Sequence, residues 1–503
     1  MRGLADLRWL NRFIDETPGD HVEGGSPRQV LRACWSKVIP AEVPDPEVVA
    51  WSEEMAQVLG LDRKEANLLA GNELCAGMEP YSQCYGGHQF GVWARQLGDG
   101  RAITLGEVDT EDGVLELQLK GSGLTPYSRT ADGKAVLRSS IREFLCSEAM
   151  FHLGVPTTRA LSLCTTGEEI LRDMLYDGNP AHEPGAIVCR VAPSFLRFGS
   201  YQIHAYRGDE ESLKTLVHHT LRTHFSHLDS EGDELLLDWL KEVAEVTAMM
   251  VTHWMRVGFV HGVMNSDNMS IHGLTIDYGP YGWVENYDLD WTPNTTDLAN
   301  RRYRFGQQPS IAGWNLARLL ESISPLMNDT AGLQEIMGHY SATFSKTSRR
   351  MWCEKLGIEE FDEEIVNELI GLFHRAETDM TLFFRHLAKL VEPDVDEIQD
   401  CFYDPSSVPV SEWEDWLARY ISVAQPDRLV KMNRVNPKYV LRNWMAQLAI
   451  DKAEVGDFSL VSELHELLKC PYDEQPDMQD DWYQKRPEWA RDRVGCSMLS
   501  CSS

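Results

Sequence analysis

The spacing of apolar residues changes along the chain, and this change limits the folds that the chain can adopt. Between about residues 83 and 125, apolar residues fall in short runs separated by glycine-marked turns, a pattern typical of an antiparallel sheet. The three runs are Phe90–Trp93, Ala102–Leu105 and Val114–Leu119. From about 310 to 470, apolar residues instead recur at helical spacing. The sequence therefore predicts an α+β protein with a β-rich first part and a mostly helical second part.

The segments between these two regions add a few more elements. Residues 135–153 have a helical pattern, which Gly154 and Pro156 bring to an end. Strand-like runs at 158–165 and 186–192 and a long helical pattern at 233–257 complete the prediction.

We expect a bilobal organisation from this order of elements. Residues 1–80 would form an N-terminal extension packed on the lobes, because short helices alternate there with proline-marked turns. Residues 81–190 would form the β-rich lobe, which contains one key helix, and residues 191–503 the helical lobe. Two lobes leave a cleft between them, and clefts of this kind bind ligands.

The composition excludes several classes of protein. The chain has 503 residues, with 47 Lys and Arg against 78 Asp and Glu, so its formal charge is −31. A chain this acidic is not expected to bind nucleic acid, which selects a basic surface. No uncharged apolar run approaches the ~18 residues of a membrane span, so no membrane partner is expected.

The N-terminus and the cysteines bear on the compartment. The first twenty residues lack an apolar signal core and carry four acids, which favours the cytoplasm, or the mitochondrial matrix if an import sequence was removed. No Cys-x-x-Cys occurs among the 11 cysteines. Cys501, the third residue from the end, is a candidate redox residue; an unremarkable tail is the equally weighted alternative.

The segment from Gly258 to Gly279 carries the strongest chemical signal. Asp267 and Asn268 precede two short alternating runs, Met269–Ile271 and Leu274–Ile276, which we interpret as a hairpin. Asp277 follows, so that Asn268 and Asp277 would lie together at its open end. One amide and one carboxylate oxygen suit Mg²⁺, which uses few protein ligands. Asp267 could then accept a proton from a hydroxyl; the alternative is a solvated hairpin with an acidic turn.

This order resembles the catalytic and metal-binding loops of a protein kinase, in which a base is followed by a metal-binding Asn and then by Asp-x-Gly. The match is incomplete. The base of a protein kinase precedes the Asn by five residues, whereas Asp267 adjoins Asn268, and His261-Gly262-Val263 replaces the usual His-Arg-Asp. The resemblance implies a bilobal protein-kinase-like fold.

Further kinase-like features precede this segment. Gly98 and Gly100 let the backbone approach phosphates closely, although a plain hairpin turn would explain them equally well. Lys120 ends an alternating strand and Glu143 lies on the following helix, so they could form the ion pair that aims a Lys at phosphate; two solvated side chains are the alternative. Arg101, Arg190 and Arg197 could bind phosphates bidentately or form ordinary salt bridges.

Five longer motifs resemble the selenoprotein O family, also called the YdiU or protein adenylyltransferase family. They are Tyr85–Gly91, Gln96–Arg101, Thr125–Lys134, Pro156–Leu161 and His261–Asn268. The tail Cys501-Ser-Ser503 resembles that of family members, some of which carry selenocysteine at the Cys position. In some members this residue is thought to pair with a Cys shortly after Asp-x-Gly, and residues 287–294 here contain none.

The resemblance implies a kinase-like enzyme that transfers AMP from ATP to Ser, Thr or Tyr hydroxyls of proteins and releases pyrophosphate. It implies Asp267 as the base, Mg²⁺ (or Mn²⁺) on Asn268 and Asp277, and Glu143 paired with Lys120. The residues implied in ATP binding are Gly98, Gly100, Arg101, Lys120, Asp132, Gly133, Arg190, Arg197 and Asp277. A pseudokinase scaffold and a kinase-like phosphotransferase are the alternatives, since spacing alone does not distinguish AMP transfer from phosphate transfer.

Overall fold

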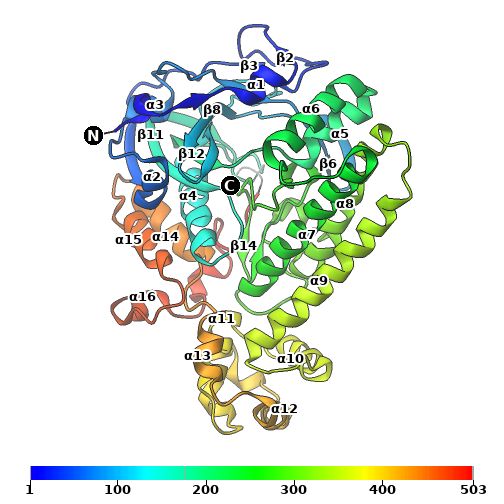
Figure 1. Cartoon of the computed structure of the whole chain (residues 1–503). Helices are drawn as coiled ribbons and strands as arrows, with labels where there is room; N and C mark the ends of the chain where they lie inside the picture. The colour runs from blue at the N-terminus through cyan, green and yellow to red at the C-terminus, as the bar shows by residue number, and fades with distance from the viewer. Residues whose placement is uncertain (1, 176, 501–503) are drawn as a thin grey trace.

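The computed structural model describes residues 2–175 and 177–500, and Figure 1 shows its architecture. The chain is α+β, as predicted: a large mixed sheet is built from the first 192 residues, and helices dominate the rest.

The large sheet has the strand order β2-β3-β5-β8-β9-β12-β11-β4, and β1 and β10 pair onto β8 and β12. All of its pairings are antiparallel except the parallel pair of β2 and β3. The predicted runs at 102–105, 114–119, 158–165 and 186–192 all lie in or at the ends of its strands. The strands are β1 (Trp9–Leu10), β2 (Gly19–Asp20), β3 (Trp35–Lys37), β4 (Glu47–Trp51), β5 (Tyr81–Gln83), β8 (Ala102–Thr110), β9 (Gly113–Lys120), β10 (Ala135–Val136), β11 (Arg159–Arg172) and β12 (Ala181–Ala192).

The prediction of a strand at Phe90–Trp93 holds for Val92 and Trp93 and is wrong for Phe90 and Gly91. Strands β6 (Gly86–Gln89) and β7 (Val92–Gln96) form a separate two-stranded hairpin, and Phe90 and Gly91 make its turn. Both turn residues have positive φ, 50° at Phe90 and 84° at Gly91. A two-residue hairpin loop of this kind needs such angles, so the apolar run is interrupted by backbone geometry that its hydrophobicity does not reveal.

Strands from the N-terminal segment lie at both ends of the strand order. Strands β2 and β3 form one end, and β4 forms the other through its pairing with β11. The same N-terminal segment also forms three short helices, α1 (Arg12–Glu16) before β2, and α2 (Glu53–Leu59) and α3 (Ala66–Ala70) after β4. The middle of the sheet therefore comes from residues 81–192, and the earlier strands flank it.

Helix α4 (Leu137–His152) is the predicted helix of the β-rich part. It packs against β11 and β12 and also against two helices from the end of the chain, α14 (Asn443–Ala453) and α15 (Ser459–Lys469). Figure 1 shows these C-terminal helices beside α4. Because neighbours cover it so fully, most of its polar residues are buried, and Glu143 is only 2% exposed.

The remaining helices confirm the helical prediction for 233–257 and for most of 310–470. Helix α7 packs along α9 and α8, and the short pair β13 and β14 lies between α7 and α8 in the chain. No helix in the described ranges is both long and apolar enough to cross a membrane. The elements are α5 (Phe198–Arg207), α6 (Glu210–His224), α7 (Gly232–Val257), β13 (Phe259–Val260), β14 (Gly282–Trp283), α8 (Gln308–Ile323), α9 (Gly332–Leu356), α10 (Glu363–Arg375), α11 (Met380–Lys389), α12 (Val410–Val423), α13 (Arg428–Asn433) and α16 (Gln479–Trp482).

Two buried carboxylates oppose each other within the sheet. Glu107 of β8 and Glu116 of β9 are register partners, and each is 2% exposed. Glu107 is paired with Arg12, at 2.7 Å between Nη2 and Oε1. Burial, together with repulsion from Glu107, raises the pKa of Glu116 to about 8.

We expect Glu116→Gln to make the protein more resistant to alkaline conditions. Native Glu116 keeps a proton that the unfolded chain releases, so the wild-type free energy of unfolding falls as pH rises from about 4.5 to about 8. The wild type loses ~1.4 kcal/mol of unfolding free energy for each unit by which the pKa is raised. The glutamine side chain of the variant does not ionise, so the variant does not lose this free energy. Thermal unfolding at pH 6 and pH 9 measures the difference, with Glu111→Gln in the exposed β8–β9 turn as control. Equal losses in all three proteins would contradict this expectation.

Candidate active site

A cavity of about 660 Å³ opens between the large sheet and the segment from Val263 to Pro280. Its size is typical of a small-molecule site. It brings together most of the residues that the sequence singled out, although they are far apart in the chain. Those that line it are Gly98, Gly100, Arg101, Lys120, Asp132, Gly133, Arg190, Asp267, Asn268 and Asp277.

Lys120 and Glu143 form an ion pair beside this cavity. Lys120 is the last residue of β9, and its Nζ donates to Oε2 of Glu143 on α4. The other oxygen of Glu143 accepts from Nη1 of Arg190 at 3.2 Å. Burial lowers the pKa of Lys120, and the Glu143 carboxylate opposes that shift. Neither side chain is solvated, because β9 lies inside the sheet and α4 is covered on both sides.

Asp277 is held between two arginines. Its Oδ1 accepts from Nη1 of Arg190 at 2.8 Å, and its Oδ2 accepts from Nη1 of Arg197. Burial alone would raise the pKa of Asp277, but Arg197, Arg190 and Lys120 outweigh it and hold that pKa well below its usual range. Asp277 also has a positive φ of 56°, which Asp tolerates better than most residues.

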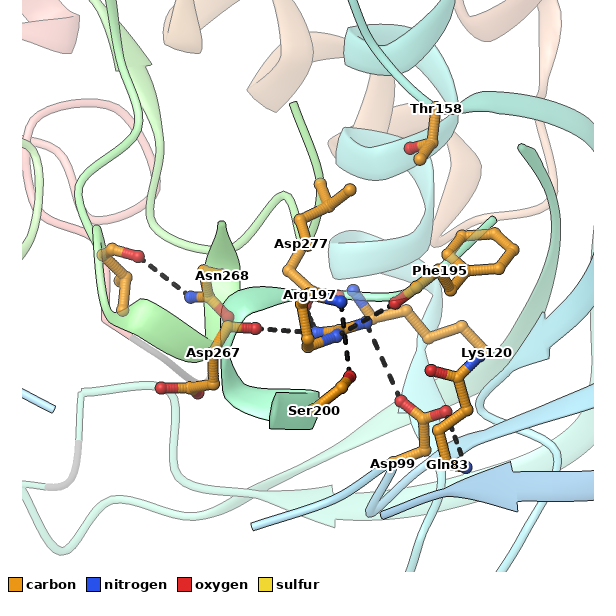
Figure 2. A network of polar contacts seen from close by, with 12 residues as sticks. Gln83, Asp99, Lys120, Thr158, Phe195, Arg197, Ser200, Asp267, Asn268 and Asp277 are labelled. Atoms are coloured by element: carbon orange, nitrogen blue, oxygen red, sulfur yellow. Dashed lines mark hydrogen bonds and ion pairs between the residues drawn. The ribbon is translucent and has the colours of Figure 1, made fainter. Parts of the chain in front are cut away.

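Arg197 contacts residues from distant parts of the chain, and Figure 2 shows it between Asp99 and Asp267. It lies at the N-cap of α5 and is 1% exposed, although it does not itself appear on the cavity wall. Its Nη1 also donates to the backbone oxygen of Asp267 at 2.9 Å, and its guanidinium lies over the ring of Tyr85. Its Nη2 is 3.9 Å from Oδ1 of Asp99. The Arg197 guanidinium therefore contacts both the loop that holds Asp99 and the segment that holds Asp267.

Asp267 lies in a short 3-10 helix, Ser266–Asn268, and is 6% exposed. Burial raises its pKa to about 7, against the opposing effects of its own backbone N–H, Arg197 and Gln89. Its Oδ1 has no hydrogen-bond partner among residues 2–175 and 177–500. A carboxyl group that titrates near neutrality suits a general base, because it can both take up and release a proton at physiological pH.

The predicted hairpin after Asn268 is wrong. Residues 269–271 and 274–276 do not pair with each other; Ser270 forms an antiparallel bridge with Arg197, and Thr275 a parallel bridge with Thr157. Runs this short gain too little from a free-standing hairpin, so their backbone groups pair with neighbouring segments instead. The His272-Gly273 turn itself is present, with Gly273 N–H donating to Ser270 O at 3.3 Å.

Asn268 and Asp277 nonetheless line the same cavity. The Nδ2 of Asn268 donates a hydrogen bond to Val263 O at 2.9 Å, which orients the side-chain amide. The side-chain oxygen is then left to coordinate a cation. The described ranges contain no group of three or more His, Cys, Asp or Glu arranged to hold a metal. One amide and one carboxylate oxygen still fit Mg²⁺, which completes its coordination with water and phosphate oxygens.

The glycines of the two neighbouring loops have a packing role. A Cβ on Gly98 would lie 2.3 Å from the Tyr127 side chain, and one on Gly133 would lie 2.1 Å from Gly123 O. Both residues also have positive φ. Asp132 is paired with Arg172, at 2.7 Å between Oδ1 and Nη2. Close packing of these loops is thus a sufficient reason for glycine at 98 and 133.

The sequence does not mark Asp99 as a site residue, because Asp99 lies between Gly98 and Gly100 and has the pattern of an ordinary turn residue. It is 3% exposed, and its Oδ2 accepts from Gln83 N at 3.1 Å and from Gln118 Nε2 at 3.2 Å. Gln118 in turn accepts from Arg190. This network supports both arginines, and no local pattern in the sequence signals it.

The end of the described chain lies near the site, and the predicted redox residue Cys501 is outside the described residues. Leu499 O accepts from Thr295 N at 2.7 Å, and Ser500 Oγ donates to Met174 O in the turn after β11. Cys496 is buried, and burial raises the pKa of its thiol to about 11.

Comparison with known proteins agrees with the resemblance seen in the motifs. A family model described as protein adenylyltransferase SelO matches residues 28–469. A protein nucleotidyltransferase YdiU of Aromatoleum aromaticum is 54% identical over 99% of this chain and 100% of its own length. Proteins of the same description from Flavobacterium johnsoniae and Rhodopirellula baltica are 50% and 53% identical, over 99% of this chain and at least 99% of their own lengths. The chain is therefore an enzyme, a nucleotidyltransferase, and it belongs to the SelO family of protein adenylyltransferases.

Proposed function

We propose that this enzyme transfers AMP from ATP to Ser, Thr or Tyr hydroxyls of proteins and releases pyrophosphate. One observation carries the proposal: Asp267, whose pKa is raised to about 7, borders the same cavity as Lys120 and Arg190. A base and a set of cations are what a hydroxyl and a triphosphate need. The names of the family and of the YdiU relatives support nucleotidyl transfer to protein.

The nucleotide would occupy the cavity in a protein-kinase-like arrangement, between the sheet and the Asp267–Asp277 segment. Gly98, Gly100, Arg101, Asp132 and Gly133 would contact ATP from the two loops, and Lys120, Arg190 and Arg197 its phosphates. Asn268 and Asp277 would hold Mg²⁺ or Mn²⁺, which neutralises charge on the phosphate oxygens when bound. These assignments follow the family motif, and the cavity lining includes all of these residues except Arg197, which lies behind Asp277.

The reaction needs one proton transfer and one displacement. Asp267 takes the proton of the acceptor hydroxyl, whose oxygen attacks the α-phosphorus of ATP. A new P–O bond forms to the acceptor as the bond to the bridging oxygen of the β-phosphate breaks. Pyrophosphate leaves with the electron pair, and Arg190 and Arg197, both buried, stabilise its charge in a low-dielectric surrounding.

Labelled ATP distinguishes this proposal from the alternatives. We expect protein to become labelled by ATP carrying ³²P at the α-position and not by ATP carrying it at the γ-position, with release of one pyrophosphate per transfer. The enzyme itself and a mixture of proteins rich in exposed hydroxyls serve as acceptors. Label from the γ-position alone would indicate a phosphotransferase. Nucleotide binding without label from either position would indicate a pseudokinase scaffold.

A further inference from the structure

The β6–β7 hairpin holds three consecutive side chains of the loop that carries Asp267. Residues 88, 89 and 90 of the hairpin each donate one hydrogen bond, and each bond goes to the side chain of a different residue in the segment 265–267. No other strand pair in the described chain belongs to this small sheet, so the hairpin is a separate structural unit placed on the loop. The contacts are His88 N to Ser266 Oγ at 2.8 Å, Gln89 Nε2 to Asp267 Oδ2 at 3.4 Å, and Phe90 N to Asn265 Oδ1 at 3.3 Å.

The two carboxylate oxygens of Asp267 meet this hairpin differently. Oδ2 receives the Gln89 amide, whereas Oδ1 lies against Gly87. A Cβ at position 87 would be only 2.3 Å from Oδ1, so no other residue fits there without moving the carboxylate. Because Oδ1 has no partner, Gln89 supplies the only side-chain donor to this carboxylate among the described residues.

The hairpin is anchored on its other side by aromatic packing. The ring of Trp93 stacks on Tyr206 of α5, with centroids 4.1 Å apart. The ring of His88 packs edge-on against Trp314 of α8, and its Nε2 is 3.1 Å from the hydroxyl of Tyr206. Phe90 keeps its positive φ while its N–H also reaches the hydroxyl of Tyr303 at 2.8 Å. The hairpin is thus a fixed support and not a free loop.

We infer that Gln89 is a positioning residue for the reaction, which orients the Asp267 carboxylate toward the acceptor hydroxyl; this inference rests on the proposed function. A carboxylate with one hydrogen-bonded oxygen keeps a defined rotation about its χ2 bond, and misplacement of a base by about 1 Å can cost roughly 10²-fold in rate. The Gln89 contact is long at 3.4 Å. Catalytic hydrogen bonds commonly tighten only when substrate binds.

The test compares Gln89→Ala, Gln89→Glu and Gln89→Met, with Val92→Thr as the matched control. Val92 is the register partner of Gln89 on the same hairpin, but its side chain is 71% exposed. We expect Gln89→Ala and Gln89→Met to lower kcat for transfer of α-labelled AMP by about 10-fold or more, with KM and Kd for ATP unchanged within two-fold. Gln89→Glu keeps the shape but cannot donate, so it should fall at least as far. Val92→Thr should match the wild type.

A purely packing role makes a different prediction, because Glu and Met would then preserve activity through their similar size. Full activity in Gln89→Glu or Gln89→Met, or an equal rise in KM and fall in kcat, would overturn the inference while wild-type AMP transfer still stands. Absence of AMP transfer in the wild type would overturn the proposed function and this inference with it. Melting temperatures of all variants identify any that fail to fold. If one Gln89 substitution does fail, the other two still distinguish a positioning role from a packing role.

Discussion

Replacing Asp267 with Asn should lower AMP transfer by about 10³-fold while ATP still binds, because general-base catalysis contributes roughly 10²–10⁴-fold. Asn has the same shape as Asp but does not take up the proton of the acceptor hydroxyl. The substitution should not unfold the protein. Burial raises the pKa of Asp267 from 3.8 to about 7, so the wild type loses stability as pH rises between these two values, and Asn, which does not ionise, avoids this loss.

Label transfer from α-³²P-ATP measures the rate, and calorimetric titration with ATP measures the affinity. Asp229→Asn, in the exposed segment before α7, is the control and should behave as the wild type. Transfer within ten-fold of the wild type would remove Asp267 from the role of base. Loss of ATP affinity in parallel with rate would indicate that Asp267 acts mainly in nucleotide binding.

The second large effect is expected for Asp277→Asn, and it concerns stability. Arg190 and Arg197 are buried, and both depend on the Asp277 carboxylate. Removing one partner of a buried ion pair leaves uncompensated charge and typically costs about 3–5 kcal/mol. The variant should therefore melt at a clearly lower temperature. Because the pKa of Asp277 is held below its usual value, the wild-type advantage should shrink as pH falls well below 3.8.

Pyrophosphate provides a check on the cause of this destabilisation. A multivalent anion that reaches the two arginines should raise the melting temperature of Asp277→Asn by more than that of the wild type, in which Asp277 already compensates their charge. The exposed Asp229→Asn serves again as control. A melting temperature equal to that of the wild type would contradict the expectation that the two arginines depend on Asp277 as a shared counter-ion.

Sequence periodicity predicted the long elements well. The helix expected at 233–257 is α7 at Gly232–Val257, and the helix expected at 135–153 is α4 at Leu137–His152. Amphipathic patterns of this length leave little ambiguity. The short apolar runs at 90–93 and 269–276 did not predict their structure correctly. The structure of the first depends on turn angles, and that of the second on backbone partners more than 70 residues away.

Some residues of the candidate site could be predicted from the sequence, and others could not. The ordered motif around Asp267, Asn268 and Asp277 was visible because its members are close in the sequence. Gln89 and Asp99 were not, since their importance arises from contacts with residues 178 and 19 positions away. A polar residue on a hairpin, such as Gln89, or in a glycine turn, such as Asp99, looks like an ordinary surface residue until tertiary structure places it, and a single sequence does not carry that information.

The position of the earliest strands has a consequence for how the chain assembles on the ribosome. Strand β4 is synthesised early, but its one partner among the described strands is β11, more than a hundred residues later, and β3 pairs with β2 and then waits for β5 on its other side. Until then β4 has no strand partner and β3 has one open edge, which is the circumstance that invites self-association in nascent chains. Synthesis of the first third of this protein is therefore the stage at which a chaperone would have most to protect, and shortening the N-terminus would leave two sheet edges open in the finished molecule.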